Sequence, residues 1–246
     1  MADAPRLVLG LQPVREAIAA HGRRLAAVWV DRRGEPRLDA VARFATDQGV
    51  ADVKRVAGAE LDRVSRGTAH QGVAAWAPEL FLQREAALLE RDDLIAVALD
   101  GIQDPQNFGA VVRSAVAMAG AAVVWPEHGS APLTPATFRA SAGAIEHATL
   151  CRVRTLAGFL LEARGAGAQV VGLDAQAPVE LGDLELTRPT IVVLGSEHTG
   201  MGRAVRRACT SLARLVEPVH LDSLNASAAA AIALYVIRKK LGIFKP

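Results

Sequence analysis

Apolar runs alternate with amphipathic helical segments in the first third of the chain. Helical spacing is present in "PVREAIAAHG" and "RLDAVARFATDQG", whereas "AAVWVD" and "DVKRVA" have the composition of strands. A further helical segment, "AELDRVS", and the apolar run "QGVAAWAP" complete the pattern. We therefore expect a small α/β domain over residues 1–77, followed by a charged, helix-prone linker over residues 78–92.

The pattern becomes more regular from Asp93 onward. Helical segments separate five apolar runs, which predict strands: "LIAVALD", "AAVVW", "AQVVGLD", "TIVVLG" and "ARLVEPV". This alternation is typical of a parallel sheet with helices on both faces, so residues 93–246 are expected to form a second α/β domain. In such domains ligands bind beyond the carboxyl ends of the strands, and the residues that follow each run are the candidates for function.

Composition narrows the class of protein. Hydrophobic residues make up 51% of the chain and charged residues 22%, as in a soluble globular protein, and aromatic residues make up only 4%. The net charge is +2, with arginines in local clusters that are either solvated helix faces or sites of attraction for phosphate. Two distant cysteines indicate neither a disulfide nor a metal site, and a cytoplasmic location fits. No signal or membrane-spanning pattern is present.

The stretch "LDGIQDPQNFGAVVRSAVAMAG" follows the first strand of the second domain. Asn107 is either the N-cap of the helix that starts there or a binding residue. Arg113 has small or apolar neighbours at three and four positions on either side, so we expect its guanidinium to emerge from a buried face. A buried arginine requires anionic or carbonyl partners, which favours a functional interpretation over a structural ion pair.

Two further loops carry polar groups beside small residues. In "TIVVLGSEHTGM" a strand leads into Gly195, and Glu197 follows in a loop that is also compatible with an ordinary turn. In "HLDSLNASAAAAIALYVI", Ser223 and Asn225 precede an alanine-rich helix. Either residue is able to cap that helix, whose small side chains predict close packing against a neighbour.

With these three loops the chain resembles the SpoU (TrmH-like) branch of the SPOUT RNA methyltransferases. The resemblance rests on "DPQNFGAVVRSA", "VLGSEHTGM" and "SLNASAAAAI", which occur in the order and spacing of the family motifs. Three further stretches are similar to its ribosomal-RNA guanosine 2′-O-methyltransferase subgroup, so the resemblance extends over nearly the whole chain. They are "VLGLQPVREAI", "HQGVAAW" and "ASAGAIEHATLCRV".

The resemblance implies a fold and an activity. The first domain would be an RNA-binding domain similar to ribosomal protein L30, and the second an α/β domain with a deep trefoil knot. The family transfers a methyl group from S-adenosylmethionine to a ribose 2′-hydroxyl and acts as a homodimer; neither a metal nor a membrane is implied. The positions that match the catalytic positions of the family motifs are Asn107, Arg113, Glu197, Ser223 and Asn225, so the resemblance implies that these residues are catalytic. The cofactor would contact Leu194, Gly195, Val216, Val219 and Leu224.

Two departures from the family affect the cofactor loops. His198 replaces a glycine that is frequent after the motif glutamate. The segment from Pro218 to Ser223 is also about two residues shorter than in the subgroup, which affects the alignment of Val216 and Val219.

The chemistry of arginine limits its role in this reaction. A guanidinium remains protonated at neutral pH, so we expect Arg113 to bind a phosphate and stabilise the developing oxyanion, and not to act as a base. Glu197, Ser223 and Asn225 would orient it and the hydroxyl, and His198 is an incidental candidate for the base. The first hypothesis is methylation of a guanosine in large-subunit ribosomal RNA. The alternatives are a tRNA, an adenosine as in resistance methylases, or a noncatalytic RNA-binding or ribosome-assembly protein.

Overall fold

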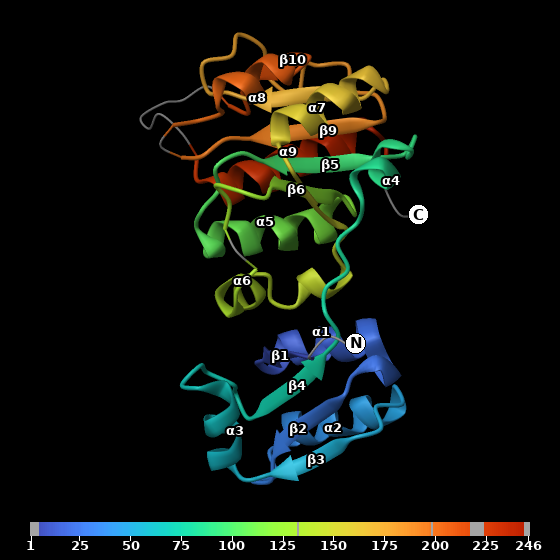
Figure 1. Cartoon of the computed structure of the whole chain (residues 1–246), viewed down its shortest axis with the longest axis vertical. Helices are drawn as coiled ribbons and strands as arrows, with labels where there is room; N and C mark the ends of the chain where they lie inside the picture. The colour runs from blue at the N-terminus through green and yellow to red at the C-terminus, as the bar shows by residue number, and fades with distance from the viewer. Residues whose placement is uncertain (1–4, 132, 198, 217–223, 244–246) are drawn as a thin grey trace. The chain divides into compact units, whose positions relative to one another are not determined.

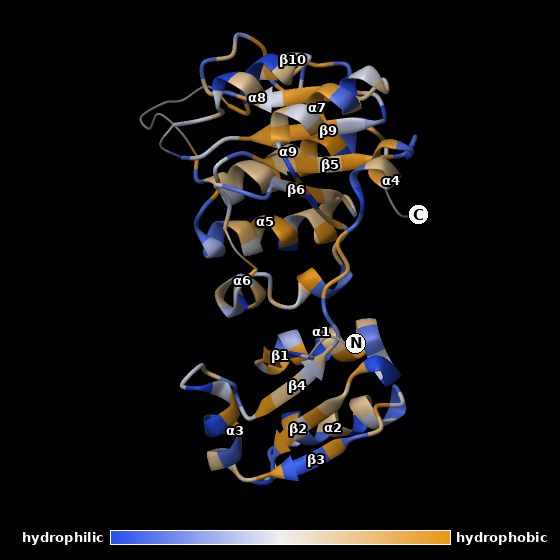
Figure 2. Cartoon of the chain, viewed as in Figure 1, coloured by the Kyte–Doolittle hydropathy of each residue, from blue (hydrophilic) through white to orange (hydrophobic). Residues whose placement is uncertain are grey.

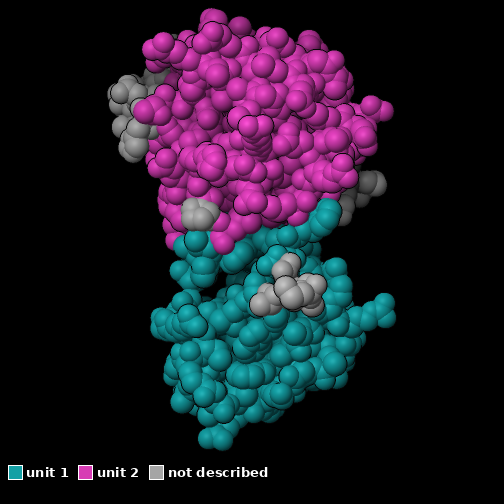
Figure 3. Space-filling model, in the orientation of Figure 1, with its two compact units in different colours: residues 1–81, 134–147 teal, residues 82–133, 148–246 magenta. Residues whose placement is uncertain are grey.

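The computed structural model describes residues 5–131, 133–197, 199–216 and 224–243. The chain divides into two compact units, which Figure 3 colours separately. Unit 1 contains residues 1–81 and 134–147, and unit 2 contains residues 82–133 and 148–246.

The described part of unit 1 contains a mixed sheet of four strands in the order β1-β4-β2-β3 (Figure 1). Strand β4 pairs antiparallel with both β1 and β2, whereas β2 and β3 are parallel. The elements predicted for the first third are confirmed, and β1 is a strand that the pattern did not predict. The elements are β1 (Arg6–Leu9), α1 (Leu11–His21), η1 (Gly22–Arg24), β2 (Ala27–Asp31), α2 (Pro36–Asp47), β3 (Val53–Val56), α3 (Gly58–Ser65), β4 (Val73–Ala77), α6 (Pro135–Ala140) and η2 (Ala144–His147).

Unit 1 also includes a segment from the middle of the sequence, α6 and η2. Gly143, between them, packs so closely on α1 that a Cβ atom there would lie 2.7 Å from the Glu16 side chain. The buried carboxylate of Glu146 accepts hydrogen bonds from Arg6 Nη1 at 2.9 Å and from Arg6 Nη2, and it contacts His21 Nε2 at 2.8 Å. Unit 1 is therefore discontinuous, which the division into 1–77, 78–92 and 93–246 did not anticipate.

In the described part of unit 2, six strands form a sheet in the order β10-β8-β9-β5-β6-β7, and every pairing is parallel. The predicted parallel sheet is thus confirmed. The central strand β5 is hydrophobic throughout and its neighbour β9 is apolar after Thr190, whereas the edge strand β3 of unit 1 carries Lys54 and Arg55 at its middle (Figure 2). The elements are α4 (Glu85–Leu89), β5 (Ile95–Leu99), α5 (Pro105–Met118), β6 (Ala122–Pro126), β7 (Leu150–Val153), α7 (Leu156–Gly165), β8 (Gln169–Leu173), β9 (Thr190–Leu194), α8 (Arg203–Ala208), β10 (Ser211–Ala213) and α9 (Ala226–Lys240).

Helices cover both faces of this sheet. Helices α7 and α8 bury Phe159, Leu160 and Val205 against one face. Helix α9 packs along α5 on the other, where Ala230 and Ala233 are fully buried and their small side chains permit a close approach. The predicted close packing of the alanine-rich helix is therefore confirmed.

Three local predictions differ from the structure. The charged linker is helical only over Glu85–Leu89 and belongs to unit 2. Strand β10 ends at Ala213, where the apolar run "ARLVEPV" begins, because the main chain of Arg214 pairs with the segment at Val179 and Glu180 and no longer with β8; Arg214 N donates to Val179 O at 2.9 Å. Strand β7 was not predicted. None of the described helices is long and apolar enough to cross a membrane.

Candidate functional site

The loop that follows β5 ends at the first turn of α5, and Asp104 caps that helix. The Asp104 carboxylate accepts hydrogen bonds from the main-chain N–H groups of Gln106 at 3.0 Å and Asn107 at 3.3 Å. The alternative that Asn107 is the N-cap is therefore wrong. Its side chain is available for other contacts.

Asn107, Glu197 and Asn225 form one hydrogen-bonded network, although each belongs to a different sequence motif. Glu197 Oε1 accepts hydrogen bonds from Asn107 Nδ2 at 2.9 Å and from Asn225 Nδ2 at 2.6 Å. Asn225 Nδ2 also donates to Asn107 Oδ1 at 2.9 Å. These bonds fix the orientation of both carboxamides, so the structure brings the three sequence motifs together at a single point.

The network is anchored at the start of α9. Asn225 is the N-cap of this helix, and its Oδ1 accepts from the main-chain N–H and the hydroxyl of Ser227 at 3.0 and 2.6 Å. The main-chain N–H of Ala226 donates to Glu197 Oε1 at 3.1 Å. A carboxylate at the N-terminus of a long helix interacts favourably with the helix dipole. Glu197 therefore holds α9 in place as well as orienting the two asparagines.

The loop that carries Glu197 folds back on itself directly after β9. Ser196 and Gly200 exchange main-chain hydrogen bonds of 3.1 and 2.9 Å, and the hydroxyl groups of Ser196 and Thr199 lie 2.6 Å apart. A Cβ atom on Gly195 would lie 2.2 Å from the carbonyl carbon of Gly200. Because the main chain at Gly200 lies so close to position 195, only glycine fits there, and any side chain is excluded in this conformation.

Arg113 occupies a different environment from the one expected. It is exposed on α5, although Gly109 on the preceding turn is buried. Within the described ranges it makes no hydrogen bond or ion pair. The expectation of a buried face was wrong because α9 covers another side of α5, and the guanidinium is free to bind a ligand from solvent.

The predicted cofactor residues lie at the carboxyl edge of the sheet, so far as they are described. Leu194 ends β9 and is buried, and Gly195 follows it. Val216 and Leu224, which flank the gap at 217–223, are 51% and 41% exposed. Their exposed side chains are available for contact with a ligand. Ser223, Val219 and His198, and the shortened segment from Pro218 to Ser223, lie outside the described residues.

Sequence reasoning missed two residues that support this site. Asp100, directly after β5, accepts a hydrogen bond from the main-chain N–H of Gly202 at 2.7 Å, and Ser227 donates to Asn225 as described. The position of Asp100 immediately after an apolar run was the signal that marked it. Ser227 carried no signal beyond its place in the third motif.

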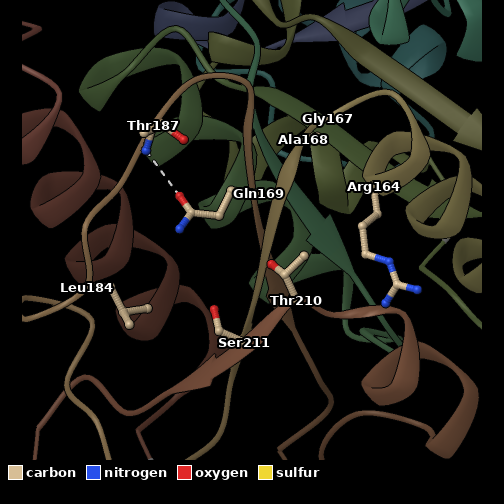
Figure 4. Close-up of a pocket in the computed structure, with 8 residues that line it drawn as sticks. All are labelled: Arg164, Gly167, Ala168, Gln169, Leu184, Thr187, Thr210 and Ser211. Atoms are coloured by element: carbon tan, nitrogen blue, oxygen red, sulfur yellow. Dashed lines mark hydrogen bonds between the residues drawn. The ribbon is translucent and has the colours of Figure 1, made fainter.

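A shallow pocket of about 450 Å³ lies elsewhere, at the amino ends of β8, β9 and β10 (Figure 4). Its polar side chains already bind the main chain: Gln169 Oε1 accepts from Thr187 N at 3.1 Å, and Thr210 Oγ1 donates to Val170 O at 2.7 Å. These side chains therefore tie neighbouring strands together and supply no reactive group.

The rest of the described chain offers little alternative chemistry. Burial raises the pKa of the Cys151 and Cys209 thiols to about 11, so neither is a nucleophile at neutral pH. The described residues contain no group of three or more histidine, cysteine or acidic side chains that is able to hold a metal ion. The exposed Glu197 carboxylate and Asn225 carboxamide, with the half-buried Asn107, are suited to binding hydroxyl groups and orienting them.

Comparison with protein families gives matches in both parts of the chain. The SpoU rRNA Methylase family matches residues 94–235. The family described as RNA 2′-O ribose methyltransferase substrate binding matches residues 7–82.

Relatives and solved structures agree with these families. An uncharacterized tRNA/rRNA methyltransferase of Mycolicibacterium smegmatis is 37% identical over 251 residues, which cover 97% of this chain and 78% of the relative. The SpoU methyltransferase AviRb of Streptomyces viridochromogenes, solved with the cofactor AdoMet, is 25% identical with a TM-score of 0.76, covering 97% and 91% of the two chains. An AdoMet-bound rRNA methyltransferase of Sinorhizobium meliloti has the same fold, with 24% identity, a TM-score of 0.77 and coverage of 96% and 87%.

Proposed function

The chain belongs to the SpoU rRNA methylase family, and we propose that it transfers a methyl group from S-adenosylmethionine to the 2′-hydroxyl of a guanosine ribose in large-subunit ribosomal RNA. The observation that supports this most strongly is the network of Asn107, Glu197 and Asn225. A binding module has no need of a carboxylate and two carboxamides locked together beside a glycine loop. The noncatalytic alternative is therefore less well supported.

Methyl transfer to a hydroxyl requires alignment of the reacting atoms and stabilisation of the oxygen as its proton leaves. S-adenosylmethionine supplies the electrophilic methyl group when bound. Glu197 uses Oε1 for its contacts with Asn107 and Asn225, and its Oε2 makes no hydrogen bond within the described part of the chain. We assign to Oε2 the role of accepting a hydrogen bond from a ribose hydroxyl, which orients the nucleophile.

Arg113 binds the phosphate next to the target ribose in this proposal. Its exposure and the absence of a protein partner among the described residues leave all five guanidinium N–H groups available. Because the group stays protonated at neutral pH, it stabilises negative charge on the RNA and on the reacting oxygen and does not accept the proton.

An Arg113→Lys variant tests this role, because lysine loses a proton more readily but makes no bidentate contact. We expect its methylation rate at neutral pH to fall by about tenfold or more. A matched control is Arg91→Lys, because Arg91 pairs with Asp93 at the other edge of the sheet and the substitution should leave the rate unchanged. A variant at Arg113 that matches the parent at pH 7 and gains rate at alkaline pH would show that residue 113 acts as a base.

The substrate has a second candidate. The relatives are named as tRNA/rRNA methyltransferases, so a tRNA ribose is a second candidate substrate in addition to the ribosomal guanosine. Mapping 2′-O-methyl groups on ribosomal RNA and tRNA from cells with and without this protein separates them. Loss of one ribosomal 2′-O-methylguanosine supports the proposal, whereas loss of a tRNA site or of a 2′-O-methyladenosine overturns the choice of substrate.

We further propose that the protein is a homodimer and that α9 contributes to the interface. The outer face of this helix exposes Ile232 to 37% and Tyr235 to 54%, although the opposite face is buried on α5. Large apolar side chains spaced at i and i+3 form a stripe that a second helix would cover.

A further inference from the structure

The carboxylate of Asp100 joins the two loops that carry Asn107 and Glu197. Asp100 is the first residue after β5, and its main-chain N–H donates to Leu194 O on the neighbouring strand β9 at 2.8 Å. Its Oδ2 accepts from the main-chain N–H of Gly202 at 2.7 Å. Gly202 is the last residue of the loop that begins at Gly195, so Asp100 contacts the strand end before this loop through its main chain and the end of the loop through its carboxylate.

The described residues of the loop from Gly195 to Gly202 are joined by hydrogen bonds of their own. Ser196 and Gly200 exchange two main-chain hydrogen bonds, and Thr199 N donates to Ser196 Oγ at 3.2 Å. These bonds fix the internal shape of the loop, but they do not fix its position over the sheet. Its first residue follows β9, and its last residue, Gly202, is the N-cap of α8 and accepts a hydrogen bond from Arg206 N at 2.9 Å. The bond from Gly202 to Asp100 ties this far end directly to the end of β5.

Met201, next to the far end of the loop, packs on strand β8 of the sheet. A Cβ atom on Gly172 of β8 would lie 2.8 Å from Met201 Cε, which shows that the Met201 side chain rests directly on this strand. Release of Gly202 would let Met201 move away from β8 and would open the turn at Gly195. Hydrogen bonds to a carboxylate are shorter and stronger than those between neutral groups, so this bond is well suited to hold the loop.

Glu197 has separate anchors. It accepts hydrogen bonds from Asn107, Asn225 and the main chain of Ala226, and among the described residues none of the three is hydrogen-bonded to Asp100. Loosening of the loop at Gly202 should therefore disturb the main chain around Gly195 more than the carboxylate of Glu197.

We infer that Asp100 is a positioning residue, which sets the Gly195–Gly202 loop in the conformation that binds S-adenosylmethionine without itself contacting the reacting atoms. This inference rests on the proposed function, in which the cofactor contacts Leu194 and Gly195. It assigns to Asp100 an effect on cofactor affinity that is distinct from the effect of Glu197 on the rate of transfer.

The test breaks the same bond from both sides in the full-length protein. Asp100→Ala removes the acceptor, and Gly202→Pro removes the donor at a residue whose φ of −60° suits proline. Asp100→Asn keeps an acceptor oxygen and is the conservative variant. Asp93→Ala is the matched control, because Asp93 precedes the same strand β5 at its other end and is bound to Arg91.

The readouts are the Kd for S-adenosylmethionine by calorimetry, the KM for the cofactor and kcat with RNA, and the melting temperature. We expect Asp100→Ala and Gly202→Pro each to raise Kd and KM by about ten- to a hundredfold, with kcat changed by less than about threefold. The double variant that combines Asp100→Ala with Gly202→Pro should bind the cofactor no more weakly than either single variant, because both changes remove the same bond. Asp100→Asn should retain most of the affinity of the parent, and Asp93→Ala should match the parent.

Three results would overturn the inference. The first is an unchanged Kd in folded Asp100→Ala and Gly202→Pro. The second is a lower kcat with an unchanged KM in these variants. The third is a loss of cofactor affinity in Asp93→Ala as large as the loss in Asp100→Ala. If only Asp100→Asn folds, a Kd within threefold of the parent supports the inference and a larger loss contradicts it. Failure of the parent protein itself to bind S-adenosylmethionine would overturn the proposed function, which the parent measurement detects separately.

Discussion

The Oε1 atom of Glu197 and the Nδ2 atom of Asn225 lie 2.6 Å apart, although the two residues are 28 positions apart in the chain. The same oxygen accepts from Asn107 and from the first N–H of α9. This one carboxylate therefore connects all three motifs. Its removal breaks several hydrogen bonds at once and should disturb the site more than the loss of a single bond.

We predict that Glu197→Ala lowers the rate of methyl transfer by about a hundredfold or more, because both carboxamides lose their common acceptor. Glu197→Gln keeps an acceptor oxygen and should lose about tenfold or less. The measurement is single-turnover transfer at saturating cofactor, with Glu185→Gln as an exposed control. Equal rates for Glu197→Ala and the parent would show that the network has no part in the reaction.

Position 195 should tolerate no side chain. Gly195→Ala places a Cβ atom 2.2 Å from the main chain of Gly200, and the loop must move to accommodate it. We expect a loss of about 1–3 kcal/mol in the free energy of unfolding and a weaker Kd for S-adenosylmethionine. Gly182→Ala is the control, because a Cβ atom there meets no atom within 4 Å. Chemical denaturation and calorimetry measure both quantities, and two variants with identical values would contradict the steric argument.

The ion cluster of unit 1 should make stability depend on pH. Burial alone would raise the pKa of Glu146, but hydrogen bonds from His21 and Arg6 outweigh burial and hold the pKa below its ordinary value of 4.5. A carboxyl group whose pKa is lower in the folded state stabilises the protein above about pH 4.5, and this contribution is lost as the pH falls through the folded-state pKa.

Glu146→Gln should therefore cost about 3 kcal/mol of unfolding free energy at pH 7, and the difference from the parent should shrink below pH 4.5. Denaturation at a series of pH values measures this, with the exposed Glu79→Gln as control. A difference that stays constant with pH would mean that the charge of Glu146 does not contribute to stability.

The outer face of α9 should mediate dimerisation. Tyr235→Glu places a charge on the exposed apolar stripe and should convert the dimer to a monomer in light scattering. Leu161→Glu is a matched control on α7, where a leucine is similarly exposed at 50% on the other side of the sheet. Dissociation by Leu161→Glu but not by Tyr235→Glu would locate the interface elsewhere.

Local patterns in the sequence predicted most of the helices and strands, though not β1 and β7, and they marked the three polar segments of the site. They succeeded because the motifs that contain Asn107, Glu197 and Asn225 each adjoin a strand or helix whose period is visible over a few residues. The chain order of the motifs also identified the family.

Contacts between distant parts of the chain were not visible in the same way. Glu146 joins unit 1 through Arg6, 140 positions away, and no local period encodes that pairing. The exposure of Arg113 depends on which side of α5 is covered by α9, and small neighbours alone gave the wrong answer. The role of Asp100 required the partner at Gly202 to be seen.

Methyl transfer to a ribose in RNA is open to a direct assay. The purified protein is incubated with unmodified large-subunit ribosomal RNA and S-adenosylmethionine labelled in its methyl group, and the RNA is then digested to nucleosides. We expect label in 2′-O-methylguanosine with the parent protein and none with Glu197→Ala. Label on a base, or no label in any RNA, would contradict this expectation.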